Sequence, residues 1–163
     1  MNVIPLQPEG QLWLPAFFCA HWGSEEVVVH ETVYHPARLP GFCVRMDGEI
    51  VGVITYSLTG DACEIVSLDS LRPGQGIGSA LMITVEEVAR ASGCRSVWLV
   101  TTNDNLNALR FYQKRGYRLV KLRPGAVDQA RQLKPQIPCL GEDGIPIRDE
   151  LEFEKKLDRG RPD

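Results

Sequence analysis

The segment from Ala62 to Val100 restricts the fold more than any other part of the chain. It has the pattern of a strand, a loop with three glycines in five positions, a helix whose apolar residues recur at helical spacing until Gly93, and the uninterrupted apolar run Ser96–Val100. Such a run is typical of a strand that is buried on both faces of a sheet. The sequence therefore predicts an α/β or α+β domain with Ser96–Val100 at its centre.

Three antiparallel strands are predicted before the helix of this segment. Phe42–Met46 and Ile50–Tyr56 flank the dipeptide Asp47-Gly48, which supplies the positive φ angles of a tight hairpin turn. A second turn at Thr59–Asp61 leads into the third strand. The other predicted elements are helices over 11–22 and 105–115, the second capped by Asn103 or Asp104, and strands over 26–30, 117–122 and 149–157.

A single domain over residues 1–163 accounts for the composition. A chain of 163 residues that is 44% hydrophobic can bury one sizeable core, and we expect residues 158–163 to fray.

The net charge of −3 gives no reason to expect a nucleic-acid or membrane partner. The apolar run Leu12–Trp22 is shorter than the about 20 residues that a membrane span needs. Five scattered cysteines without a C-x-x-C pair fit neither a disulfide framework nor a zinc site, so we expect reduced thiols, no metal and a cytoplasmic protein.

The glycine-rich stretch SLRPGQGIGSALM, residues 70–82, has the pattern of an anion site. Backbone N–H groups at the start of a helix have no partner within the helix, and glycine lets a phosphate approach them. A Walker nucleotide loop is a poor fit because no lysine stands next to Ser79, and a dinucleotide fingerprint is a poor fit because that serine occupies its third glycine position. A plain strand-to-helix turn remains as an alternative.

A second motif lies in the helix that follows the central strand. Asn105, Ala108 and Tyr112 fall at three- and four-residue spacings and so form one stripe on that helix. The small alanine would let a ligand pack between an amide and a phenol. Alternatively, Phe111 and Tyr112 are ordinary core aromatics.

Together the two motifs resemble those of the GCN5-related N-acetyltransferase (GNAT) superfamily. LDSLRPGQGIGSALM is similar to its pyrophosphate-binding motif, and NLNALRFYQKRGY matches its N-x-x-A-x-x-x-Y-x-x-x-G-[FY] pattern. The resemblance covers residues 42–122 well. It implies a mixed, mostly antiparallel sheet of six or seven strands flanked by helices, with a splay between the third and fourth core strands.

The resemblance also implies acetyl-CoA as co-substrate. Its pyrophosphate would lie on the backbone of the loop, and its pantetheine arm would pair with the third strand. The implied coenzyme-binding residues are Val66, Leu68, Gln75, Gly76, Ile77, Gly78, Ser79 and Asn105. One position departs from the family: Pro73 stands where an arginine or glutamine is common, and Arg72 is displaced by one residue.

The resemblance assigns the chemistry to two residues. Tyr112 would protonate the departing thiolate, and Glu64 would deprotonate the ammonium of the acceptor, directly or through water. Asp69 is a weaker candidate for the base, since regular alternation sends it to the opposite face from Glu64. Cys63 is expected to be a small buried residue rather than an acyl carrier. For His21, His30 and His35 we expect surface or capping roles.

The predicted function is acetyl-CoA-dependent transfer of an acetyl group to a primary amine by direct attack in a ternary complex. The alternatives are a coenzyme A-binding sensor or scaffold without turnover, and a related fold that acts on protein or aminoacyl-tRNA. A small-molecule amine is the expected acceptor, the acidic last strand hints at a polycationic one, and a homodimer is left open. Tyr34, His35 and the connection 124–148 are the expected acceptor-side elements.

Overall fold

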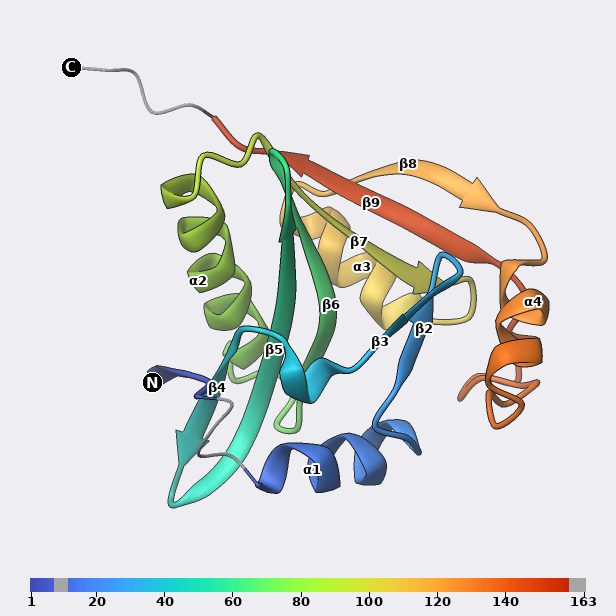
Figure 1. Ribbon diagram of the computed structural model, residues 1–163, viewed down its shortest axis with the longest axis horizontal. Helices are drawn as coiled ribbons and strands as arrows, with labels where there is room; N and C mark the ends of the chain where they lie inside the picture. Colours follow the sequence, from blue (N-terminus) through green and yellow to red (C-terminus); the bar gives the residue numbers. More distant parts are fainter. Residues whose placement is uncertain (8–11, 159–163) are drawn as a thin grey trace.

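A twisted seven-stranded sheet runs through the centre of the computed structural model, which describes residues 1–7 and 12–158 (Figure 1). The strand order is β1-β4-β5-β6-β7-β9-β8, and only the pair β6 and β7 is parallel. The strands are β1 (Asn2–Pro5), β4 (Gly41–Met46), β5 (Glu49–Thr59), β6 (Ala62–Ser70), β7 (Ser96–Thr102), β8 (Arg118–Arg123) and β9 (Glu150–Lys156). This confirms the predicted mixed, mostly antiparallel sheet.

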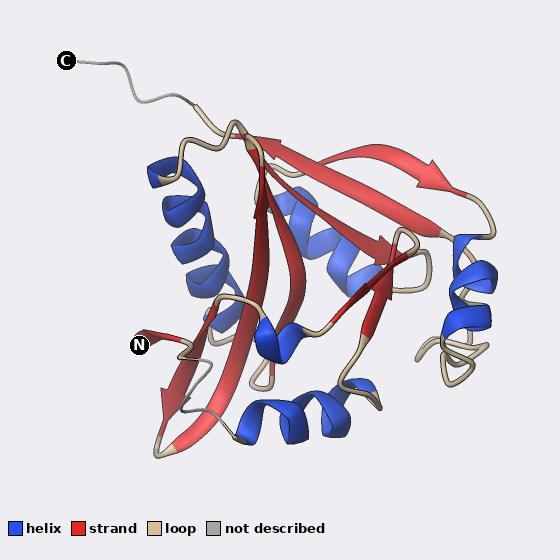
Figure 2. Cartoon of the chain, viewed as in Figure 1, coloured by secondary structure: helices blue, strands red, loops and turns tan. Residues whose placement is uncertain are grey.

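Helices cover both faces of the sheet (Figures 1 and 2). On one face, α2 (Ile77–Ala91) and α3 (Leu106–Lys114) bury the larger apolar cluster, in which Leu81 and Phe153 are fully buried. On the other face lie α1 (Trp13–Trp22), α4 (Ala126–Leu133), a 3₁₀ turn at Pro36–Arg38 and a separate hairpin of β2 (Val27–Val29) and β3 (Thr32–Tyr34).

A β-bulge at Val66 separates β6 from β7. Thr55 on β5 faces Ser67, but the next residue, Tyr56, faces Ile65, so Val66 is an extra residue in β6. The pairing of β6 with β7 runs from Ala62–Ser96 to Ile65–Leu99 and ends there. Beyond that point the strands diverge, which confirms the predicted splay between the third and fourth core strands.

The bulge also overturns one sequence-based expectation. Regular alternation predicts Glu64 and Asp69 on opposite faces, but the extra residue between them brings both onto the face of α1 and the β2–β3 hairpin. Trp22 of α1 donates to Asp69, and Tyr34 of β3 donates to Glu64. The opposite-face prediction was wrong because a bulge shifts the two-residue period by one.

Some short elements were not predicted. The edge strand β1, the three-residue β3 and the eight-residue α4 within the 124–148 connection have too few residues to show a period. The first helix begins at Trp13, and its predicted start at Gln11 lies outside the described residues. The second is capped by Asn105 rather than by Asn103 or Asp104. Of the tail that was expected to fray, residues 159–163 lie outside the described residues. No helix of the described chain is both long and apolar enough to cross a bilayer.

The contact between β5 and α2 is tight enough to be tested by mutation. A Cβ atom at Gly52 would lie 2.4 Å from Cγ2 of Ile77, at the start of α2. Gly52→Ala is therefore expected to lower the free energy of unfolding by about 1–3 kcal/mol, measured by urea denaturation. Thr59→Ala, at an exposed position of the same strand, should change it by no more than about 0.5 kcal/mol. Equal effects of the two changes would contradict this packing.

Candidate active site

The glycine loop leaves backbone amides free at the start of α2. Gly76 caps the helix with φ 75°, a conformation that favours glycine, and no side chain caps these amides. The first intrahelical bond runs from the Ala80 amide to the Gly76 oxygen. The amides of residues 76–79 therefore have no acceptor within the helix, and the helix dipole adds positive potential there. The loop has the geometry of an anion site.

A cationic side chain supports this loop from α3. The Arg115 guanidinium donates to the Ser79 hydroxyl and lies 3.4 Å from the centroid of the Phe111 ring. That ring in turn packs against Gly78, where a Cβ atom would come within 3.1 Å of it. Arg72 instead pairs with Asp47 and Glu49 at the β4–β5 turn, outside the glycine loop. The positive charge next to the loop is therefore that of Arg115, which sequence reasoning did not single out.

The loop and the splay open at the same edge of the sheet. β6 and β7 are parallel, and the helices that follow them, α2 and α3, both begin at the carboxyl ends of these strands. A cavity of about 280 Å³ lies over the splay, and Val66, Val100 and Asn105 line it. The Asn105 side chain accepts a hydrogen bond from the Ala108 amide and so caps α3. The structure therefore brings Val66 and Asn105 together, whereas Leu68 lies half-buried against the core on the other face.

Tyr112 lies on α3, on the face of the sheet that α2 and α3 cover. It is 8% exposed and packs against Tyr117 and Phe153. Burial, together with the negative charge of Asp69, raises the pKa of its phenol. The hydroxyl therefore stays protonated at neutral pH. Tyr112 therefore packs as a core aromatic, and its protonated hydroxyl has a proton that it could donate.

Glu64 is the centre of a polar cluster on the opposite face of the sheet. It is 5% exposed. One carboxylate oxygen accepts from Nε2 of His30 at 2.6 Å, and the other accepts from the Tyr34 hydroxyl at 2.6 Å. Burial and the hydrogen bond to Glu64 raise the pKa of Tyr34, so its phenol remains a donor. The hydrogen bond to Glu64 raises the pKa of His30 above its ordinary value, against the opposing effect of burial.

The turn that presents His30 is strained. His30 and Glu31 connect β2 to β3 as a two-residue turn, and their φ angles are 39° and 65°. A tight hairpin turn of this kind favours asparagine and glycine at both positions. The buried carboxylate of Glu150 on β9 accepts from the His30 amide at 3.1 Å and holds the turn in place. The expectation of surface or capping roles was therefore wrong for His30, because a tertiary contact 34 residues away decides its position.

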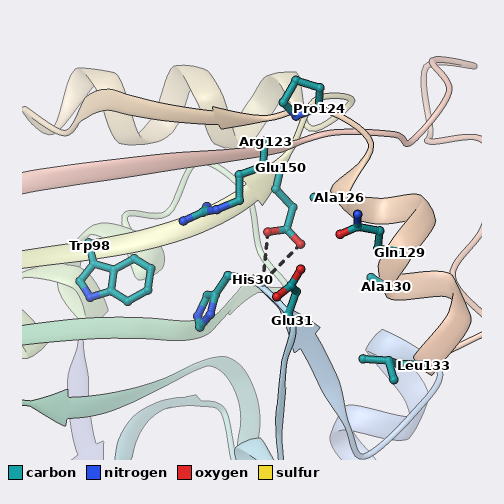
Figure 3. A pocket seen from close by; sticks show the side chains of 10 residues that line it. All are labelled: His30, Glu31, Trp98, Arg123, Pro124, Ala126, Gln129, Ala130, Leu133 and Glu150. Carbon is teal, nitrogen blue, oxygen red and sulfur yellow. Dashed lines mark hydrogen bonds between the residues drawn. The ribbon is translucent and has the colours of Figure 1, made fainter.

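A second cavity of about 380 Å³ lies beside this cluster, between the β2–β3 turn, α4 and strands β7 to β9 (Figure 3). Glu150 and Ala130 line both cavities, so the two adjoin. The Trp98 ring forms part of the wall, 5.2 Å from the His30 ring. The strand predicted as fully buried thus presents one aromatic residue to a cavity.

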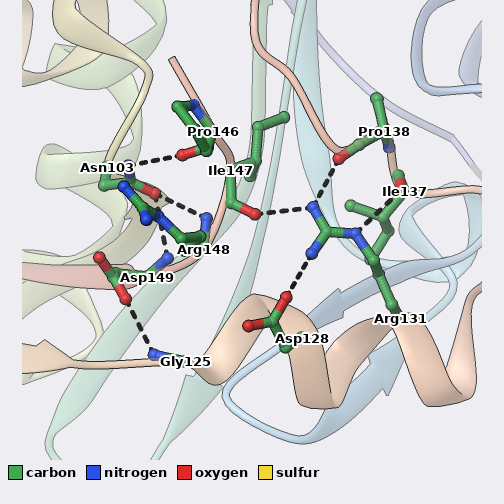
Figure 4. A network of polar contacts seen from close by, with 10 residues as sticks. All are labelled: Asn103, Gly125, Asp128, Arg131, Ile137, Pro138, Pro146, Ile147, Arg148 and Asp149. Atoms are coloured by element: carbon green, nitrogen blue, oxygen red, sulfur yellow. Dashed lines mark hydrogen bonds and ion pairs between the residues drawn. The ribbon is translucent and has the colours of Figure 1, made fainter.

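The 124–148 connection forms the outer wall of both cavities, and polar contacts hold it there (Figure 4). Arg131 of α4 donates to the backbone oxygens of Ile137, Pro138 and Ile147. The Asn103 side chain accepts from the amides of residues 148 and 149. The connection lines a cavity together with His30, and its assignment to the acceptor side stays a prediction.

The described residues offer no cluster that could hold a metal ion, and Cys63 is not an activated thiol. Within residues 1–7 and 12–158, no group of three histidine, cysteine or carboxylate side chains is arranged to hold a metal ion. Cys63, next to Glu64 in sequence, is fully buried, and burial raises its pKa to about 12. A thiol in that state is a poor nucleophile at neutral pH.

Comparison with known proteins identifies the family. A model of the Acetyltransferase (GNAT) family matches residues 10–117. The chain belongs to the GNAT acetyltransferase family. The uncharacterized protein YdhI of Bacillus subtilis strain 168 is 46% identical over 97% of this chain and 99% of its own length.

Solved structures of GNAT proteins share the fold. The IAA acetyltransferase from Bacillus cereus aligns with a TM-score of 0.71 and 20% identity, covering 96% of this chain and 100% of that one. A GNAT family acetyltransferase from Elizabethkingia anophelis, solved with acetyl-CoA bound, aligns with a TM-score of 0.66 and 19% identity, covering 96% of this chain and 97% of the other. The predicted resemblance to the GNAT superfamily and its fold is confirmed.

The titration of His30 tests the Glu64 cluster. Because its folded-state pKa lies above the unfolded-state value, the pair stabilises the fold fully below about pH 6.5, and this contribution is lost as pH rises through the folded-state pKa. Glu64→Gln should lower the pKa of His30, since it removes the largest effect that raises it and leaves burial opposed only by a backbone hydrogen bond and the charge of Glu150. Histidine side-chain NMR measures this shift. Glu154→Gln, on β9 and paired with Lys156, is the control and should leave the pKa of His30 unchanged. An unchanged pKa in Glu64→Gln would contradict the pairing.

Proposed function

We propose that this GNAT protein transfers an acetyl group from acetyl-CoA to a primary amine by direct attack. One observation carries the proposal. β6 and β7 part at the Val66 bulge, while a protonated buried phenol, Tyr112, packs on one face of the sheet and the His30–Glu64 pair lies on the other face. A donor in the splay would thus have a proton donor on one side and a proton acceptor on the other.

Three features support acetyl-CoA as the co-substrate. The amides of Gln75–Ser79 and the guanidinium of Arg115 would bind its pyrophosphate. The edge of β6 from Val66 onward has no strand partner toward β7, so its backbone groups can pair with the extended pantetheine arm. A solved GNAT neighbour contains acetyl-CoA. When bound, acetyl-CoA would supply the thioester carbonyl that the amine attacks.

The acceptor would lose its proton on the face of the β2–β3 hairpin. Neutral His30 that donates Nε2–H to Glu64 keeps a lone pair on Nδ1. The Thr32 hydroxyl lies 3.3 Å from Nδ1 and would give way to the ammonium, whose proton that lone pair can take. Glu64 then stabilises the imidazolium and acts through His30, because its own oxygens already accept from His30 and Tyr34. This assignment refines the expectation that Glu64 alone is the base.

The departing thiolate would be protonated on the other face. As the nitrogen–carbon bond forms and the carbon–sulfur bond breaks, Tyr112 would give its phenol proton to the sulfur. The nitrogen, which has already given one proton to His30, would lose its second proton to solvent as the amide forms, and solvent would later restore the phenol proton. A backbone N–H near Leu68 would polarise the carbonyl oxygen. The His30, Glu64 and Tyr34 cluster has no role in a module that only binds coenzyme A, so the catalytic function is favoured over the sensor or scaffold.

The direct test is a thiol-release assay with acetyl-CoA and a panel of small amines, aminoglycosides and peptides. The proposal expects release that depends on one class of small amine. Absence of release with every amine, while coenzyme A binds, would favour the non-catalytic alternative.

Removal of the Tyr112 hydroxyl tests the acid. Tyr112→Phe should lower kcat at least about 100-fold, the usual contribution of a positioned acid, while the Kd for coenzyme A stays unchanged. Calorimetry and steady-state kinetics measure the two quantities. Tyr56→Phe is the matched control, because Tyr56 is equally buried at 8% exposed but lies on β5. Full turnover in Tyr112→Phe would remove this residue from the mechanism.

Two glycines with similar backbone angles test the anion site. Gly76 and Gly60 both have positive φ, 75° and 60°, and a Cβ atom at either would meet no other atom. Alanine at either position should therefore cost similar stability. Only Gly76→Ala should weaken coenzyme A binding, by about tenfold, because it redirects amides that bond to a charged group. Equal affinity in both variants would place the pyrophosphate elsewhere.

A further inference from the structure

The cavity beside the Glu64 cluster contains carboxylates that no cation of the protein neutralises. Its two cationic groups are already paired: Arg123 with Glu152, and His30 with Glu64. Glu150 is only 3% exposed and lines the cavity, and its oxygens accept from the backbone amide of His30. Among the described residues it has no ion-pair partner.

The rest of the cavity suits a flexible aliphatic chain. Apolar side chains of α4 and its approach, among them Ala126, Ala130 and Leu133, form one wall (Figure 3). Trp98 forms the opposite wall, and an aromatic face attracts cations. Glu31 lies on the β2–β3 turn at the rim and is exposed. The cavity thus combines apolar walls with negative charge at two points.

The cavity also adjoins the place where the reaction would occur. His30 links the two carboxylates: its amide donates to Glu150, and its ring donates to Glu64. The buried Glu150 carboxylate therefore bonds to the backbone of the residue whose ring is the proposed base. An acceptor whose amine lies at His30 can extend its other end over Glu150.

We propose that this cavity binds the far end of the acceptor and that this end carries a second positive charge. The acceptor is then a diamine or polyamine with a short aliphatic chain, whose second ammonium pairs with Glu150 and faces Trp98. Burying a carboxylate without a cation is costly, and a cationic ligand removes that cost. The inference rests on the proposed function, since it names the acceptor class of the same site.

One feature of the cavity favours a different ligand. Nη1 of Arg123 is buried and has no hydrogen-bond partner, so it could donate to a carboxylate at the far end of an amino acid. The negative charges of Glu31 and Glu150 oppose such a group. A comparison of acceptors with a cationic and with an anionic far end therefore decides whether the cavity binds a second ammonium or a carboxylate.

Three acceptors with the same four-carbon chain test the proposal: putrescine, butylamine and γ-aminobutyrate differ only in the far group. In the thiol-release assay, kcat/KM for putrescine should exceed that for butylamine at least about tenfold. Glu150→Gln and Glu31→Gln should each reduce this ratio, whereas Glu154→Gln should preserve it. The ratio of kcat/KM for putrescine to kcat/KM for butylamine is the quantity to compare. Glu150→Gln also loosens the His30 turn and so lowers kcat/KM for every acceptor.

Calorimetry with putrescine and the coenzyme A-loaded protein separates this proposal from the proposed function. Binding that weakens at least about tenfold in Glu150→Gln supports the acceptor site even without turnover. Equal kcat/KM for putrescine and butylamine, a preference for γ-aminobutyrate, or no putrescine binding at all would overturn it. Turnover of butylamine in such a case would leave the acetyltransferase function intact.

Discussion

The extra residue at Val66 is the feature on which the rest of the site depends. Without it, β6 and β7 could continue their parallel pairing beyond Ile65 and Leu99, and no backbone edge would be free in the middle of the sheet. The bulge also shifts the side-chain period, so that Glu64 and Asp69 lie on one face. One inserted residue thus ends the β6–β7 pairing and directs two carboxylates toward the face of α1 and the β2–β3 hairpin, where we propose that the acceptor binds.

Electrostatics differ sharply between the two faces of the sheet. On the face that α2 and α3 cover, burial keeps Tyr112 protonated, and Arg115 adds a positive charge beside the amides at the start of α2. On the face of the β2–β3 hairpin, Glu64 and Glu150 are buried carboxylates. Both accept hydrogen bonds from His30, one from its ring and the other from its amide. Such a division suits a reaction in which an anionic coenzyme and a cationic amine approach from different sides.

Sequence patterns predicted the parts of this protein that depend on neighbours along the chain. The glycine loop and the strands and helices between residues 42 and 122 follow from local period and turn chemistry, and the splay follows from the resemblance. The contacts of His30 and Arg115 could not be predicted, because they join residues 34 and 36 positions apart. The bulge was invisible because an inserted strand residue leaves no signature in composition.

A crystal structure with acetyl-CoA bound tests the central claim most directly. The account predicts the pyrophosphate on the amides of Gln75–Ser79 beside Arg115, and the thioester in the splay next to Val66, with the Tyr112 hydroxyl within hydrogen-bond distance of the sulfur. A coenzyme bound outside the splay, or a thioester directed away from both Tyr112 and His30, would contradict it.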